Sequence, residues 1–108
     1  MQHKELISGR WQKLSLTEQL ANIGSEVGRA GKWFQKNEEY FKGAFERAIE
    51  LFELTLSDKR WNYGQLKEIG RVKEVFCDAV EGGKEYKSSF EDLDKYFLLF
   101  ALKLRMGV

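Results

Sequence analysis

The chain has 108 residues, a length that one hydrophobic core can serve, so we expect a single helical-bundle domain over residues 1–108. Hydrophobic residues make up 43% and charged residues 32%, which excludes a disordered polyelectrolyte. The 18 Lys and Arg residues against 17 Asp and Glu leave a net charge of +1, which argues against the strongly basic surface typical of a nucleic-acid-binding domain. Because proline is absent and β-branched residues are few, the composition predicts an all-α protein.

Four amphipathic segments fill most of the chain and predict four helices. Apolar side chains recur at spacings of three and four residues over 16–36, 38–56, 65–81 and 89–105. Each segment follows a residue that can cap a helix: Ser15 with Glu18 as box partner, Asn37, Asn62 with Gln65, and Ser88 with Glu91. Gly82 and Gly83 supply a left-handed stop after the third segment. The similar lengths and short connections predict a four-helix up-down-up-down bundle with a short N-terminal extension.

Two features predict how the core packs. Phe45 and Phe52 lie on the most apolar segment, so we expect both to be nearly fully buried. Gly24, Gly28 and Gly31 share one face of the first segment, which favours close approach by a neighbouring helix.

The fourth segment carries apolar side chains on two opposite sides. Its inner stripe is already complete. Leu98, Leu99 and Leu102 project away from that stripe, on a side that a four-helix monomer cannot also cover. We therefore predict a homodimer with these leucines at its interface. An unidentified protein partner or the N-terminal segment could cover them instead.

The connection after the second segment interleaves cations with aromatic rings. Lys59, Arg60, Trp61 and Tyr63, with Arg71 beyond them, are the best candidate ligand-binding residues, since such side chains can stack a base and hold a phosphate. An aromatic lid over the end of the core is the simpler interpretation.

The sequence gives little support for a catalytic or metal-binding site. Cys77 has no histidine on a helix to activate it, and the only histidine, His3, lies near the start of the chain. We assign no catalytic residue, no metal ligand and no cofactor. The sequence leaves open whether a polar cluster of Glu26, Arg29, Glu74 and Asp78 has a function; such spacings usually mean ion pairs on a helix surface.

The longest apolar run, residues 96–102, has seven residues, and about 20 are needed to cross a bilayer. The first residues contain no apolar stretch of signal-peptide length, and the single cysteine cannot form an internal disulfide. We therefore expect a cytoplasmic protein that does not enter a membrane.

Three stretches of the sequence carry a family resemblance: LTEQLANIGSEVGRA (16–30), AFERAIELFELTL (44–56) and GRVKEVFCD (70–78). They resemble a family of small, functionally uncharacterised helical-bundle proteins of bacteria and archaea. The second stretch is also similar to the second helix of a tetratricopeptide repeat, but no second copy follows at the period of about 34 residues. The architecture also looks like helical domains that pair with minimal nucleotidyltransferases. The ribonucleases among them use an Arg followed closely by a His, and this chain has no such pair.

Two hypotheses of function follow. The first is a non-catalytic interaction or scaffold protein that associates with itself. The alternative is an accessory domain that handles nucleotides or RNA, as the second resemblance implies; nucleic-acid binding is therefore disfavoured but not excluded. An enzyme comes third.

Overall fold

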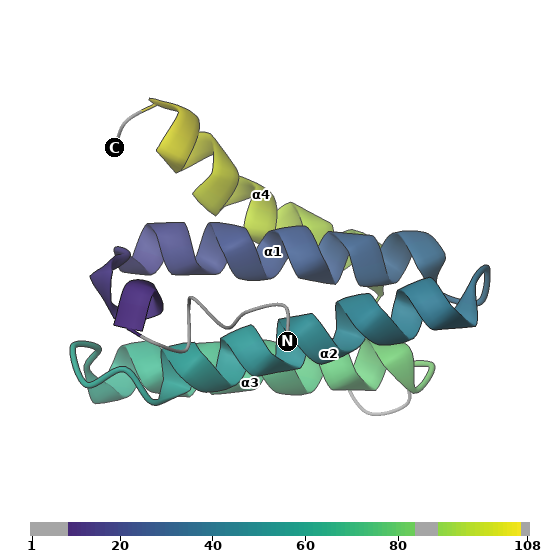
Figure 1. The fold of residues 1–108 in the computed structure, drawn as a ribbon, viewed down its shortest axis with the longest axis horizontal. Coiled ribbons are helices and arrows are strands. Elements are labelled where there is room, and N and C mark those ends of the chain that lie inside the picture. The colour runs from purple at the N-terminus through teal and green to yellow at the C-terminus, as the bar shows by residue number, and fades with distance from the viewer. Residues whose placement is uncertain (1–8, 84–88, 107–108) are drawn as a thin grey trace.

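A computed structural model describes residues 9–83 and 89–106, apart from the side chain of Leu104. A short 3-10 helix, η2 (Trp11–Lys13), precedes four α-helices. These are α1 (Leu16–Trp33), α2 (Glu38–Leu56), α3 (Tyr63–Val80) and α4 (Phe90–Met106) (Figure 1). The all-α prediction is confirmed, and α2 has the predicted bounds.

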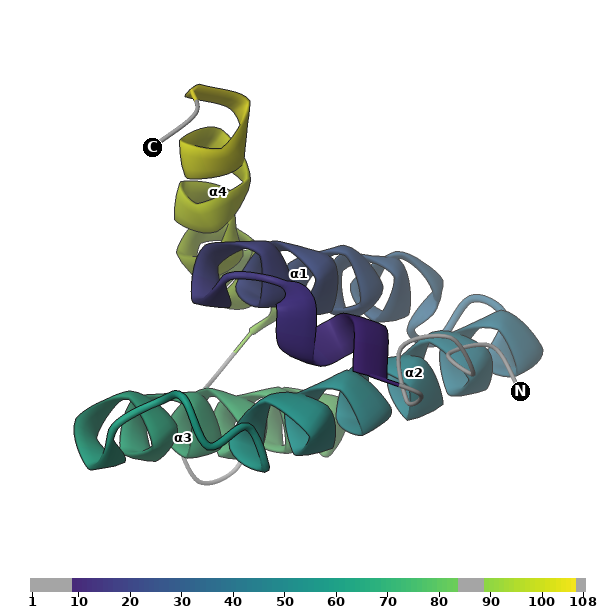
Figure 2. The same cartoon turned by 60° about the vertical axis from the view of Figure 1, so that its left-hand side comes forward.

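The four helices do not pack equally on one another. α1 is the central helix, in extensive contact with α2 on one side and with α4 on the other, whereas α3 packs mainly on α2 and barely meets α4. α1 and α2 run side by side in opposite directions, and α3 returns along α2 (Figure 1). α4 crosses α1 and then leaves the other helices toward its C-terminal end (Figure 2).

The predicted capping residues position the first three helices. Ser15 Oγ accepts from the Glu18 backbone N–H at 3.1 Å while Glu18 Oε1 accepts from the Ser15 backbone N–H at 2.9 Å. Asn62 and Gln65 form the same reciprocal box at the start of α3, which begins two residues earlier than predicted. Asn37 caps α2, as predicted.

Two predicted helix ends differ from the structure. α1 was predicted to reach residue 36 but ends at Trp33, because Gln35 adopts a left-handed backbone with φ of +61°. At the start of α4, Ser89 is the residue whose hydroxyl accepts from the Asp92 N–H, at 3.2 Å. The predicted cap, Ser88, lies outside the described residues. Gly82 and Gly83 do have the expected positive φ after α3.

The core lies between α1, α2, α3 and the first half of α4. Its largest fully buried side chains include Trp11, Phe52 and Phe76. Phe52 is buried as predicted, but Phe45 is only half-buried, which corrects that expectation. α2 turns the small residues Ala44 and Ala48 inward, and the ring of Phe45 lies at the edge, 5.4 Å from that of Phe76.

The predicted close approach at the glycines occurs between α1 and α4. A Cβ added to Gly24 would lie 2.6 Å from Phe97 Cβ, and one added to Gly31 would lie 2.9 Å from Phe90 Cδ1. Gly28 does not fit the prediction, because a Cβ there would meet nothing closer than Asp94 Oδ1 at 3.8 Å. Gly24 and Gly31 therefore let two phenylalanines of α4 reach the backbone of α1, and they fix where α4 crosses it.

Candidate functional site

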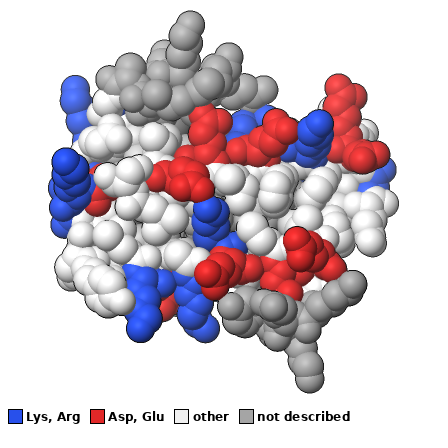
Figure 3. Space-filling model, turned by 90° about the horizontal axis from the view of Figure 1, so that it is seen from below, with Lys and Arg blue, Asp and Glu red and all other residues white. Residues whose placement is uncertain are grey.

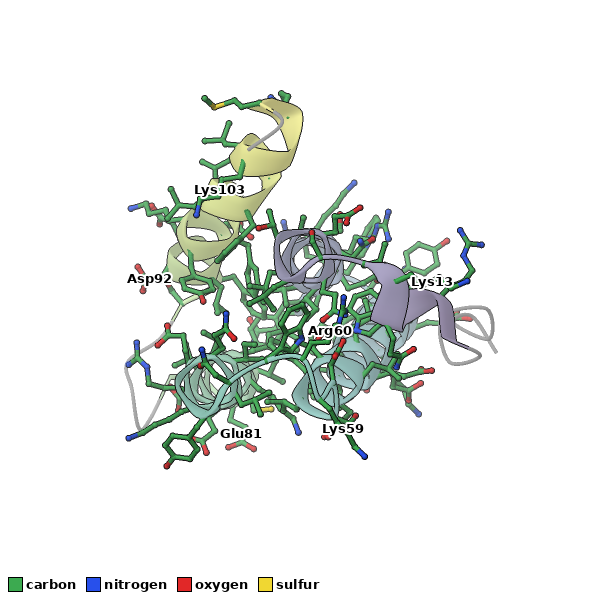
Figure 4. The ribbon with its side chains drawn as sticks, turned by 90° about the vertical axis from the view of Figure 1, so that its left-hand side faces the viewer. Lys13, Lys59, Arg60, Glu81, Asp92 and Lys103 are labelled. Carbon is green, nitrogen blue, oxygen red and sulfur yellow. The ribbon has the colours of Figure 1, made fainter. Side chains whose placement is uncertain are left out.

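Four apolar side chains form an exposed face on the part of α4 that leaves the other helices. The exposed fractions are 52% for Leu98, 59% for Leu99, 37% for Leu102 and 73% for Met106. Because they follow one another at spacings of one, three and four residues, they form one continuous surface, which we call the leucine face. Figure 4 shows the C-terminal part of α4 standing clear of the other helices. The exposure that the sequence predicted for the three leucines is present, and Met106 extends it.

The inner side of α4 explains why these leucines are left outside. Leu93 and Phe97 are buried against the core, and Phe90 and Phe100 are half-buried. The side chain of Leu104, which belongs to the same predicted stripe, is outside the described part of the chain. Since the inner stripe already occupies the side that faces the core, the side chains of Leu98, Leu99 and Leu102 are left exposed on the outer side of α4.

Two hollows border α4. A small one of about 220 Å³ lies beside Leu98, over the seam between α1 and α4, and is lined by small side chains that include Ala21, Ser25 and Ala101. A larger groove of about 420 Å³ lies where α3 and α4 separate, and its apolar lining comes from Leu16, Leu20, Ile69, Tyr96 and Phe100. Burial raises the pKa of the Tyr96 phenol, as does the charge of nearby Glu68. Both hollows are thus next to the helix that carries the leucine face.

Of the predicted ligand residues at the connection between α2 and α3, Arg60 and Trp61 bind other parts of the protein. Arg60 binds the buried carboxylate of Asp58, with Nη2 at 2.7 Å from Oδ2, and also donates to the Leu14 carbonyl at 2.6 Å. Its guanidinium carbon lies 4.3 Å from the centroid of the Trp61 ring. Gln19, fully buried, donates to Asp58 at 3.1 Å and accepts from Trp61 Nε1 at 3.2 Å.

Gln19 also donates to the Trp11 carbonyl at 2.9 Å, so this network joins η2, α1 and the connection. It holds the pKa of Asp58 at about 2, chiefly through the hydrogen bonds from Arg60. Asp58 and Gln19, which the sequence did not single out, organise the junction. Arg60 and Trp61 therefore contribute to the contacts that hold this junction together.

The side chain of Arg60 is nevertheless 40% exposed, and Lys59, Tyr63 and Arg71 are exposed as well. Lys59 points away from the helices, whereas Arg60 lies between the connection and α1 (Figure 4). Tyr63 is 79% exposed at the start of α3, and Arg71 is exposed two turns further along that helix.

A cluster that the sequence predicted only in part connects α1 to α2. The side chain of Glu26, 9% exposed, accepts from Arg29 Nη1 at 2.5 Å through one oxygen and from Arg47 Nε at 2.9 Å through the other. Arg47 was missed, because its proximity depends on the register of two antiparallel helices. Of the other predicted members, Glu74 is exposed and Asp78 is buried, both on α3.

The two arginines line a surface pocket of about 500 Å³, together with Trp33, Glu39, Tyr40, Gly43 and Ala44. We call it the Arg29–Arg47 pocket. It lies at the end where α1 is joined to α2, and Trp33 and Tyr40 meet there edge to face, with ring centroids 5.0 Å apart.

The described residues offer little for covalent or metal chemistry. Cys77 is half-buried, and burial raises the pKa of its thiol, which disfavours the thiolate that a nucleophile needs. Among the described side chains, no three His, Cys, Asp or Glu residues gather closely enough to hold a metal ion. In the same part of the chain, no helix combines the length and apolar character that crossing a membrane requires.

Charge is spread evenly over the face seen in Figure 3, where basic and acidic side chains lie side by side. A single large basic surface of the kind that binds a nucleic-acid backbone is not visible on this face. Comparison of the chain with protein-family models, with curated proteins and with solved structures finds no match.

Proposed function

We propose that this protein is a non-catalytic interaction or scaffold protein of the cytoplasm that works as a homodimer, and that two copies associate through the leucine face of α4. The observation that carries the proposal is the exposure of Leu98, Leu99, Leu102 and Met106 on the part of α4 that leaves the other helices.

The energetics favour covering this face. Burying a leucine side chain contributes about 1.5–3 kcal/mol, and a twofold axis would use each of the four side chains twice. The hollow beside Leu98 offers each copy a place for an apolar side chain of the other, because the small residues Ala21 and Ala101 line it. Self-association is therefore favoured over an unrelated partner, since one copy carries both the projecting side chains and, beside Leu98, the hollow between α1 and α4.

A second copy would also support the C-terminal part of α4. We keep the up-down-up-down bundle as the proposed arrangement of the chain. In this arrangement the C-terminal part of α4 packs against the partner rather than against α3. Lys103 and Arg105 flank the leucine face and keep charges at its rim, as in the polar rim of other interfaces.

Light scattering of the purified protein tests the proposal. At about 100 μM we expect a mass twice the chain mass of 12.6 kDa. The double variant Leu98→Glu/Leu102→Glu should be monomeric while its helical circular dichroism is unchanged, because both positions are exposed within one chain. Tyr63→Glu, at an exposed aromatic position on α3, is the matched control and should remain dimeric.

A monomeric wild-type protein would refute self-association and leave an unidentified protein partner as the occupant of this face. A dimer that survives the double variant would place the interface elsewhere.

The alternative, a nucleotide- or RNA-handling accessory domain, is the weaker proposal at the predicted site. Arg60 and Trp61 already make hydrogen bonds within the protein, to Asp58, Leu14 and Gln19, so a ligand would compete with these contacts for the exposed part of Arg60.

A further inference from the structure

The Arg29–Arg47 pocket brings basic and aromatic side chains together at the surface where α1 and α2 are joined. Its volume of about 500 Å³ falls within the range of small-molecule sites. Arg29 and Trp33 come from one face of α1, and Tyr40, Gly43 and Arg47 come from one face of α2. The antiparallel packing of these two helices places the aromatic side chains near the connection and the arginines further along.

The arginine end of the pocket is built to receive an oxyanion. Glu26 holds one guanidinium on each of its carboxylate oxygens, so two cations are fixed side by side around a single buried anion. The side chain of Arg29 is 59% exposed, and its guanidinium, which has five N–H donors, donates to Glu26 through Nη1. The planar fork of a guanidinium matches the oxygens of a phosphate or a carboxylate.

The aromatic end is suited to a flat ring. Tyr40 lines the pocket and is 54% exposed, so its ring is accessible to a ligand there. Trp33 is four residues from Arg29 on the same helix face, which separates their backbone positions by about 6 Å along the helix axis. One small molecule with a ring at one end and an oxyanion at the other can therefore reach both.

We propose that the Arg29–Arg47 pocket binds a nucleoside monophosphate, with the phosphate on the arginines and the base against Trp33 and Tyr40. Glu39 is the one acidic side chain in the lining, and it disfavours additional negative charge. The pocket therefore takes one phosphate rather than a polyphosphate chain.

Calorimetric titration with AMP, adenosine and inorganic phosphate tests the two halves of this site. We expect AMP to bind and each of the other two to bind at least about tenfold more weakly, since each lacks one half of the contacts. ATP should bind no more tightly than AMP. If phosphate binds as tightly as AMP, or if AMP gives no binding heat at millimolar concentration, the proposal is wrong.

Two variants with matched controls locate the site. Arg29→Gln removes an exposed cation and should weaken AMP binding at least about tenfold, whereas Lys67→Gln makes the same charge change at an exposed position of α3 and should not. Gly43→Leu puts a side chain into the pocket and should abolish binding, whereas Gly70→Leu, at a glycine with open space around it, should leave it intact. Circular dichroism checks that each variant is folded.

If AMP binds equally to Arg29→Gln, Gly43→Leu and the wild type, the ligand occupies another surface and this assignment is refuted. The dimer is a separate matter. The variant Leu98→Glu/Leu102→Glu changes no residue of the pocket and should bind AMP as the wild type does.

Discussion

At the scale of single residues, the contact between α1 and α4 depends on two glycines. Phe97 lies against Gly24 and Phe90 lies against Gly31, at distances that leave no space for a methyl group. The third glycine of the strip, Gly28, has that space. Gly24 and Gly28 are both glycines in the interior of α1, so comparing them separates packing from helix propensity.

Alanine substitutions at Gly24 and Gly28 should therefore change stability in opposite directions. Gly28→Ala should raise the free energy of unfolding by about 1 kcal/mol, the difference in helix propensity between the two residues. Gly24→Ala should lower it by up to about 2 kcal/mol, because overpacking costs about 1–3 kcal/mol and the propensity gain returns only about 1 kcal/mol. Urea denaturation at one protein concentration measures both values.

Gly28→Ala serves as the control for Gly24→Ala. If the two variants are equally stable, Phe97 does not lie against the backbone of α1 and the position of α4 is wrong.

Asp58 is the second residue whose role can be measured. Its pKa falls from 3.8 to about 2, mainly because Arg60 donates hydrogen bonds to the ionised carboxylate. A carboxylate with a lowered pKa in the folded state stabilises the fold above the unfolded value, and this contribution is lost as the pH falls through the folded value. The network should therefore stabilise the protein fully above about pH 5 and lose this contribution between about pH 4 and pH 2.

The variant Asp58→Asn tests this pH dependence. At pH 7 it should lower the free energy of unfolding by about 2 kcal/mol, and the difference from the wild type should shrink toward zero near pH 2. A difference that stays constant over this pH range would show that the ionisation of Asp58 does not stabilise the fold.

At the scale of elements, the ends of the helices follow local chemistry wherever a capping side chain is present. Ser15, Asn37 and Asn62 are recognisable in the sequence, because each can accept a backbone N–H three residues later. The end of α1 was not recognisable. Gln35 has the left-handed backbone that usually marks a glycine, so its residue type gives no sign of the turn.

Gln35→Gly should consequently stabilise the protein. A left-handed conformation costs a residue with a Cβ about 1–2 kcal/mol, and glycine avoids this cost at some expense in chain entropy. We expect the melting temperature to rise by a few degrees, corresponding to a gain of about 0.5–1 kcal/mol. Lys36→Gly, at the next position, where φ is not positive, should lower the melting temperature. If Gln35→Gly also lowers it, α1 does not end as described.

At the scale of the whole molecule, the spacing of apolar residues in the sequence predicts the helix content and the number of helices. The surplus of apolar side chains on the last segment was also readable, because Leu98, Leu99 and Leu102 cannot share a face with Phe97. The sequence did not predict that α4 leaves the other helices, because this depends on where α4 crosses α1. The pairing of Arg47 with Glu26 was hidden for a similar reason, because it depends on the register between two helices.

The central claim is that a second copy covers the C-terminal part of α4. Hydrogen exchange of the backbone amides tests it most directly, because an exposed helix end that lacks packing opens easily. Measured at a high and at a low protein concentration, the amides of residues 98–106 should exchange more slowly at the high one, while those of α2 should be unchanged. Equal exchange of residues 98–106 at both concentrations would contradict the claim.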